Sequence, residues 1–307
     1  MEERVRIFVG CDPNDCDLEQ MMVLEYSLRR HASLPIDIEW MRLSRDPASV
    51  WFSDSTREQG WRTENWATPF SGFRWAVPAR CGYEGRAIYM DADVLVLCDI
   101  ADLWRTPFSP GKVITGKGRK TSWRFCVSVW DNAAAKPHLP ALEQLRNDPG
   151  SHDRLMRYFA NHAELIQPIH SDYNNIDGEK KPAESIRILH YSDMGTQFSH
   201  KYALPRLQEK GARHWFDGEI LPHPRKDLEK IFDRYYNEAL ASGYRLDDYR
   251  AERLYGEVIK ESQQEYAGNH RTRSKPSFWS RLVGLSGSSV PTHRLPAGLL
   301  RRRSSSG

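Results

Sequence analysis

The sequence predicts an α/β protein in which a mixed sheet is flanked by helices and followed by a C-terminal helical segment and a basic tail. The first observation is the opening order of elements: an apolar strand at 4–12, an amphipathic helix at 17–31 and an alternating strand at 36–43. The second is a buried run at 86–97 that reads as a further strand. A β-α-β opening followed by more strands is typical of an open α/β sheet.

The remaining elements follow in chain order. Residues 44–68 are rich in aromatic side chains but have no period, which predicts a long loop. A helix at 70–80 is expected to kink or end near Pro78, and a short turn or helix is expected at 99–104. Further strands are predicted at 112–116, 123–130 and 185–191, and further helices at 139–147, 152–163, 226–241 and 247–264. We therefore expect one domain over 1–265, with its C-terminal helices at about 226–264, and a separate tail over 266–307.

Composition sets the broad class. The chain has 307 residues, 39% of them hydrophobic, which is enough for one large domain with its own core. No run approaches the ~20 apolar residues of a membrane span. The five cysteines are scattered and include no C-x-x-C, which favours reduced thiols over a disulfide framework or a zinc site. Because the first residues are charged and lead directly into a strand, no signal peptide is expected, and we predict a cytoplasmic protein.

Basic charge is concentrated at the C-terminal end. Residues 270–307 hold eight lysines or arginines and no acid, while the rest of the chain has 36 basic and 41 acidic residues. Apolar side chains around Phe278 and Trp279 lie among these basic residues, which predicts contact with an anionic membrane surface. A disordered terminus is the alternative, and no nucleic acid partner is expected.

Two carboxylates, Asp91 and Asp93, lie two residues apart in the apolar run. On a strand such side chains share one face, so both are expected to aim at the same point. Buried carboxylates cost several kcal/mol each unless a positive group meets them. Oxygen pairs of this kind suit Mg²⁺ or Mn²⁺, which often complete their coordination with substrate phosphates. The alternative is a pair of solvated acids at a strand end.

Other candidate residues lie near predicted strand ends. His190 ends the strand at 185–191 and can serve as a third metal ligand, or it can be satisfied by a backbone partner. Asp12 and Asn14 follow the first strand and can read a base or a ribose, although Asp-Pro-Asn-Asp is also plain turn chemistry. Arg74 can bind a diphosphate or stack on a base, or it can simply cover apolar surface.

These motifs, in their order along the chain, resemble those of glycosyltransferase family 8. Its members are retaining enzymes of the Rossmann-related GT-A fold that use nucleotide sugars. The resemblance runs over most of 4–205. Residues 6–14 resemble the first-strand motif that holds the nucleoside, and the segment around Arg74 resembles the one whose arginine contacts the donor. Residues 89–93 resemble the D-x-D motif that holds Mn²⁺, with Ala92 also at the donor. Residues 172–175 resemble the segment before the last shared strand, and 189–191 resemble the strand that delivers the third ligand.

The sequence departs from the family's pattern at the phosphate lysine and on the acceptor side. After the histidine the family shows H-x-x-G-x-x-K, whose lysine meets the donor phosphate. Here Gly195 falls five residues after His190, and Lys201, eleven residues after, is the candidate for that lysine. The family's Asn-Ser-Gly segment appears as residues 124–126, Arg-Phe-Cys, and its acidic-Gln pair is not recognisable between 150 and 170.

The resemblance implies transfer of a sugar, with retention, from a nucleoside diphosphate sugar such as a UDP-hexose. The acceptor would be a glycan, lipid-linked or protein hydroxyl, with Mn²⁺ or Mg²⁺ held by Asp91, Asp93 and His190. No catalytic nucleophile is assigned. A first alternative is a phosphohydrolase of the haloacid dehalogenase type, because residues 91–95, Asp-Ala-Asp-Val-Leu, superficially resemble D-x-D-x-[TV], with 247–248 as the second acidic pair. A second alternative is a non-catalytic nucleotide-sugar-binding module.

Overall fold

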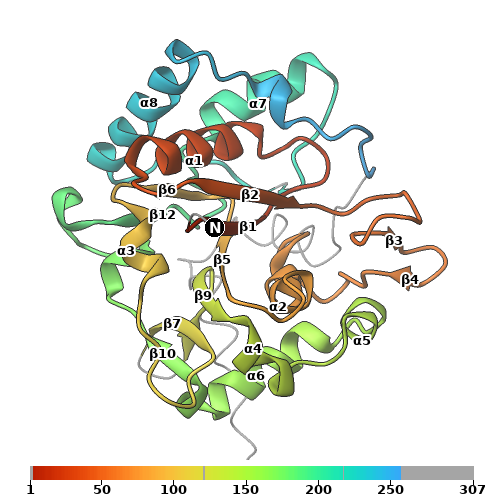
Figure 1. Ribbon diagram of the computed structural model, residues 1–307. Helices are drawn as coiled ribbons and strands as arrows, with labels where there is room; N and C mark the ends of the chain where they lie inside the picture. Colours follow the sequence, from red (N-terminus) through yellow and green to blue (C-terminus); the bar gives the residue numbers. More distant parts are fainter. Residues whose placement is uncertain (1–2, 120–121, 217, 257–307) are drawn as a thin grey trace, which may run out of the picture. The chain divides into compact units, whose positions relative to one another are not determined.

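A computed structural model describes residues 3–119, 122–216 and 218–256, all within the unit Met1–Ala267 (Figure 1). Its main sheet has the strand order β10-β7-β9-β5-β1-β2, with β8 paired to β7. Strands β1, β2 and β5 run parallel, and β9 is antiparallel to β5. A smaller sheet has the order β11-β12-β6. The predicted class, a mixed α/β sheet flanked by helices, is confirmed.

The elements have the following bounds. The strands are β1 Val5–Gly10, β2 Ile36–Met41, β3 Ser53–Asp54, β4 Gln59–Gly60, β5 Arg86–Asp91, β6 Val94–Val96, β7 Ile114–Gly118, β8 Trp123–Arg124, β9 Val127–Asp131, β10 Ile166–Pro168, β11 Asn175–Ile176 and β12 Ile188–His190. The α-helices are α1 Leu18–His31, α2 Val77–Arg80, α3 Ile100–Trp104, α4 Asn132–Ala135, α5 Leu142–Asn147, α6 Ser151–Asn161, α7 His200–Glu209 and α8 Lys226–Ala241. The 3-10 helices are η1 Ser71–Ala76, η2 Lys136–His138, η3 Ala163–Leu165, η4 Ser171–Asn174, η5 Ala183–Ser185 and η6 Leu246–Tyr249.

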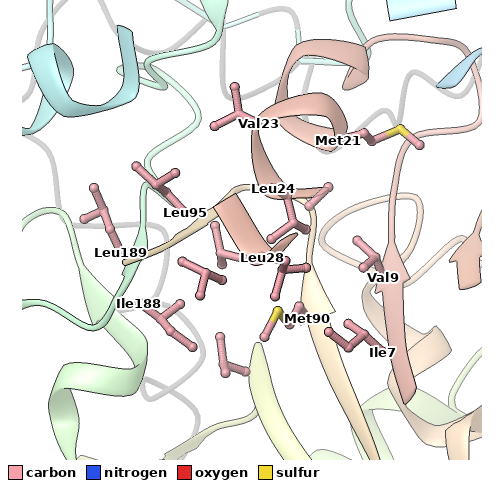
Figure 2. Packing of buried hydrophobic residues seen from close by; sticks show 14 of the residues in the cluster. Ile7, Val9, Met21, Val23, Leu24, Leu28, Met90, Leu95, Ile188 and Leu189 are labelled. Carbon is pink, nitrogen blue, oxygen red and sulfur yellow. The ribbon is translucent and has the colours of Figure 1, made fainter. Parts of the chain in front are cut away.

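Successive side chains of the main sheet point to its two faces, and each face is covered by a separate hydrophobic core. Ile7 and Val9 of β1, with Met90 of β5, belong to the core under α1, whose Leu24 and Leu28 point toward them (Figure 2). Helices α1, α7 and α8 lie on this side of the sheet, and α2, α4 and α6 lie on the other (Figure 1). Because successive strand residues point to opposite faces, odd-numbered positions of β5 face the second core.

The second core is aromatic, and the predicted loop at 44–68 supplies much of it. Trp61 and Trp66 of this segment are buried against Phe73 of η1, with ring centroids 5.1 and 5.4 Å apart. A Cβ on Gly72 would lie 2.2 Å from Cζ2 of Trp66, so only glycine fits there. The prediction of a long loop was wrong in one detail, because β3 and β4 form a short hairpin within the segment. The segment fixes η1 in place by packing.

Two predicted strands are broken in the structure. The run 86–97 forms β5 and β6, so Asp91 ends one strand and Asp93 lies in the connection, not on a single strand face. The chain leaves the main sheet at Asp91, and β6 then pairs antiparallel with β12. The run 123–130 likewise divides into β8 and β9, with Cys126 in the break. Both breaks lie where the chain passes the candidate site.

Other differences lie toward the C-terminal end. The predicted helix at 247–264 is wrong over its described part, because η6 ends at Tyr249 and no helix follows over 250–256. Helix α7, which has Pro205 inside it, was not predicted. The end of the predicted helix, 257–264, and the tail at 266–307 lie outside the described residues. Within the described part of the chain, none of the helices has the length and apolar character needed to cross a bilayer.

Candidate metal centre

The centre begins where β1 and β5 end side by side. Gly10 of β1 is the register partner of Asp91, so the loop after β1 lies next to the aspartate. On β5, Asp91 shares a face with Tyr89, whose hydroxyl donates a hydrogen bond of 2.5 Å to Asp91 Oδ1. A Cβ at Gly10 would lie 2.7 Å from that hydroxyl, so glycine leaves the room that Tyr89 needs. The end of β5 is therefore shaped to present Asp91 at the sheet edge.

Arg74 reaches Asp91 from η1. Its guanidinium lies 3.1 Å from Asp91 Oδ1 and 3.5 Å from Oδ2, and its Nε donates to the carbonyl of Ser71 at 2.7 Å. The guanidinium also lies over the ring of Tyr89. Both charged side chains are buried, with exposed fractions of 6% for Arg74 and 13% for Asp91. The arginine expected at the donor thus lies beside the metal-binding aspartate expected from the sequence.

Asp93 and His190 meet although 96 residues separate them in the chain. Their Oδ1 and Nε2 atoms lie 3.1 Å apart. Asp93 Oδ1 is nevertheless buried and accepts no well-formed hydrogen bond from the described residues. The other imidazole nitrogen, Nδ1, lies 3.2 Å from Oδ1 of Asn174, which can only accept, so Nδ1 carries the proton. Nε2 then faces a carboxylate oxygen, and either a proton or a cation between the two atoms would satisfy this arrangement.

Cys126 completes the cluster. Ligand atoms of Asp91, Cys126 and His190 lie within 4.8 Å of one another. The carbonyl of Cys126 accepts a hydrogen bond from the amide of Asp91 at 3.0 Å, which holds the two residues together. Asn174 Nδ2 donates to Cys126 Sγ at 3.7 Å. Cys126 and Asn174 lie in segments that resemble family motifs, but no role at a metal was predicted for either residue.

Gln197 is a further neighbour that sequence reasoning missed. Its Nε2 donates to Asp93 Oδ2 at 3.2 Å, and its Oε1 accepts from Gln20 of α1 at 2.8 Å. It lies in the segment after His190 where the phosphate-binding lysine was sought. A neutral amide therefore orients Asp93. The sequence holds one signal for Gln197: it lies seven residues after His190, in a stretch that has no lysine.

The other sequence candidates lie apart from this cluster or are engaged in turns. Asp12 accepts hydrogen bonds from the amides of Asn14 and Cys16, and burial raises the pKa of its carboxyl to about 6. Asn14 exchanges hydrogen bonds with the backbone of Gly256. Lys201 lies on α7 and pairs with Asp233 of α8 at 2.5 Å. The structure thus brings together Arg74, Asp91, Asp93 and His190 and places Lys201 in a different interaction.

Protonation in the centre reflects burial and close charges. Burial lowers the pKa of His190, but the carboxylate of Asp93 and the thiol of Cys126 outweigh it and raise that pKa well above its ordinary value. Burial raises the pKa of Asp91, against the opposing effect of Arg74. Burial also raises the pKa of Cys126, but His190 reverses the direction and leaves it lowered. Without a metal ion, protons therefore bind at positions where a divalent ion would neutralise the same negative charges.

Comparison with known sequences gives one partial match. No protein-family model matches the chain. Protein CDI of Arabidopsis thaliana is 35% identical over 100 residues, which are 32% of this chain and 35% of that protein, so the match covers about a third of the relative's length.

Three solved structures with a similar fold are named as glycosyltransferases. The bifunctional glycosyltransferase WbbM has 12% identity over 63% of this chain and 46% of its own, with a TM-score of 0.47. GlyE of Streptococcus pneumoniae has 15% identity over 78% and 64%, with a TM-score of 0.47. The galactosyltransferase LgtC, solved with donor and acceptor sugar analogues, has 10% identity over 76% and 96%, with a TM-score of 0.42.

Proposed function

We propose that the protein is a metal-assisted glycosyltransferase that moves a sugar from a nucleoside diphosphate sugar, a UDP-hexose, to an acceptor hydroxyl with retention. The observation that carries the proposal is the approach of Asp93 and His190 to 3.1 Å beside Asp91. Asp91, Asp93 and His190 come from β5, the β5–β6 connection and β12, and their approach supports a metal site at the sheet edge where β1 and β5 end. Ligands of open α/β sheets commonly bind at such an edge.

Each residue has a role that follows from its contacts. Asp91, Asp93 and His190 would hold Mn²⁺ or Mg²⁺, which supplies Lewis-acid neutralisation of charge on the leaving diphosphate. Arg74 fixes the orientation of Asp91 and adds positive charge beside it. Asn174 keeps the proton of His190 on Nδ1 so that Nε2 stays available. Asp12 shapes the loop after β1, next to the register partner of Asp91, where a nucleoside would lie.

The phosphohydrolase alternative lacks its second acidic pair at the site. Asp247 lies in η6 and pairs with Arg250 at the surface, and Asp248 is exposed. The binding-module alternative keeps the same metal set and differs only in turnover. An assay of UDP release from several UDP-sugars separates the two, because only the enzyme releases UDP.

Thermal unfolding with UDP, with and without Mn²⁺, tests the proposal directly. A ligand that binds the native state stabilises it by mass action and so raises the melting temperature. At a ligand concentration a hundredfold above Kd, the stabilisation is ~2.7 kcal/mol. We expect a UDP-dependent shift that requires the metal. Asp93→Asn should abolish the metal dependence with the fold intact.

The matched control is Asp102→Asn, the same chemical change at an exposed aspartate of α3 that pairs with Arg187. This variant should keep the full metal-dependent shift. The proposal is wrong if no nucleoside diphosphate gives a metal-dependent shift. The residue assignment is wrong if Asp93→Asn behaves like the control.

A further inference from the structure

Cys126 is buried near the proposed metal ligands and is not a member of the predicted set of Asp91, Asp93 and His190. Its sulfur belongs to a group of ligand atoms that lie within 4.8 Å of one another, with an oxygen of Asp91 and a nitrogen of His190. Around a tetrahedral Zn²⁺, sulfur and nitrogen ligands lie about 3.5 Å apart, as Zn–S and Zn–N bonds of ~2.3 and ~2.0 Å require. Inward movement of these side chains would place one ion among them.

Asn174 gives a second, independent indication of a thiolate ligand. One buried amide group serves two members of the cluster: Nδ2 donates to Cys126 Sγ, and Oδ1 accepts from Nδ1 of His190. An N–H directed at sulfur favours the thiolate form, and an acceptor at Nδ1 directs the imidazole lone pair toward the ion. Partners of this kind commonly surround the ligands of protein metal sites.

With all of its acidic groups ionised, the cluster reaches charge balance when it holds a divalent ion. Two carboxylates and one thiolate carry three negative charges, and the guanidinium of Arg74 supplies one positive charge at 3.1 Å from Asp91. A divalent cation brings the total to zero, which buried charges require if they are all to stay ionised. Oxygen-only sites suit Mg²⁺ and Mn²⁺, whereas a thiolate favours softer ions such as Zn²⁺ or Co²⁺.

We propose that Cys126 is a metal ligand, and that the centre formed by Asp91, Asp93, His190 and Cys126 binds a thiophilic divalent cation in preference to Mg²⁺. This inference rests on the metal site of the proposed function and changes the ion that fills it. The scattered cysteines argued against a zinc site in the sequence, but spacing cannot detect ligands that come from separate elements. Here they come from β5, the β5–β6 connection, the β8–β9 break and β12.

Titration of the metal-free full-length protein with Co²⁺ tests the inference by spectroscopy. One equivalent of bound Co²⁺ should give visible d–d bands and a near-ultraviolet thiolate-to-cobalt charge-transfer band, both removed by Zn²⁺. Cys126→Ser should lose the charge-transfer band and bind Co²⁺ at least ~100-fold more weakly, because loss of a partner around a ligand alone costs ~10–100-fold. The fold is checked by circular dichroism.

Cys98→Ser is the matched control, because Cys98 is a partly buried free thiol just after β6. It should keep the band and the affinity. A bound Co²⁺ without the charge-transfer band in the unmutated protein overturns the inference, whether or not Cys126→Ser folds. The same holds if Cys126→Ser keeps the band.

The UDP measurements separate this inference from the proposed function. A charge-transfer band that depends on Cys126, with no UDP-dependent thermal shift, supports the thiolate centre and refutes the transferase. A shift with UDP and Mn²⁺ but no charge-transfer band supports the transferase and refutes the thiolate ligand.

Discussion

Replacing Arg74 with methionine tests the physical basis of the centre. The substitution keeps most of the side-chain length but removes a guanidinium that lies 3.1 Å from Asp91, in a pair with exposed fractions of 6% and 13%. At an effective dielectric constant of 20, unit charges at that distance attract by about 5 kcal/mol. Breaking a buried pair while leaving one charge typically costs ~3–5 kcal/mol. We expect the free energy of unfolding to fall by about that amount.

Arg80→Met is the matched control. Arg80 lies on α2, directly after η1, and forms a bidentate pair with Glu39 at 3.0 and 3.3 Å, but the two side chains are 35% and 33% exposed. In water the same charges attract by only about 1 kcal/mol, and exposed pairs contribute ~0–1 kcal/mol to stability. Urea unfolding of both variants, followed by tryptophan fluorescence in the presence of a chelator, measures the difference.

The pH dependence provides a second test. Burial raises the pKa of Asp91 and Arg74 opposes that rise, so in Arg74→Met the pKa of Asp91 should rise further. The loss of stability is then largest above this raised pKa and shrinks as pH falls, because a protonated carboxyl leaves no unpaired charge. The double variant Arg74→Met, Asp91→Asn should be more stable than Arg74→Met alone at neutral pH. Equal losses in Arg74→Met and Arg80→Met would refute the reasoning.

Three further outcomes are expected. Burial lowers the pKa of His200 to about 4 and of His214 to about 3, so the unfolded chain binds more protons below pH 6.5. Stability should therefore fall by about 2 kcal/mol per histidine between pH 7.5 and pH 5, and His214→Phe should remove its share in urea unfolding at the two pH values. Gly72→Ala, whose new Cβ would lie 2.2 Å from a buried indole ring, should lower the unfolding free energy by about 1–3 kcal/mol. Gly178→Ala, with open space around the Cβ, should change it little, and equal losses would contradict the packing. Lys201→Ala should leave the UDP and Mn²⁺ thermal shift intact, because its ammonium group is engaged on α8; loss of the shift would assign it to the phosphate.

Local pattern identified much of the fold. Helix α8 was predicted at its observed bounds, and α1 within one residue, because their apolar positions recur at helical spacing. The short helix α3 begins where Asp99 caps it by accepting from the amide of Ala101. The α/β class followed from the order of these elements. Asp91, Asp93 and His190 were proposed as site residues because carboxylates and a histidine stood out in apolar runs.

The break in each predicted strand could not be read from the chain. Apolar residues continue through Val94–Val96, so periodicity alone favoured one strand across Asp93. The chain instead changes sheets after Asp91, because β6 finds its partner in β12, about 90 residues later. Long-range pairing of this kind overrides local preference. The same holds for Cys126, which sits where β8 gives way to β9.

By itself, the sequence determined which side chains are proposed to carry the chemistry of the donor side: the two aspartates, the histidine and an arginine among aromatic residues. Only the tertiary structure decided which other side chains contact these residues. Cys126, Asn174 and Gln197 reach the candidate centre from segments that carry no local signature, through contacts that span up to 104 residues. The physical reason is that strand and helix periods depend on near neighbours, whereas the shell of a metal centre is assembled by the packing of sheet ends.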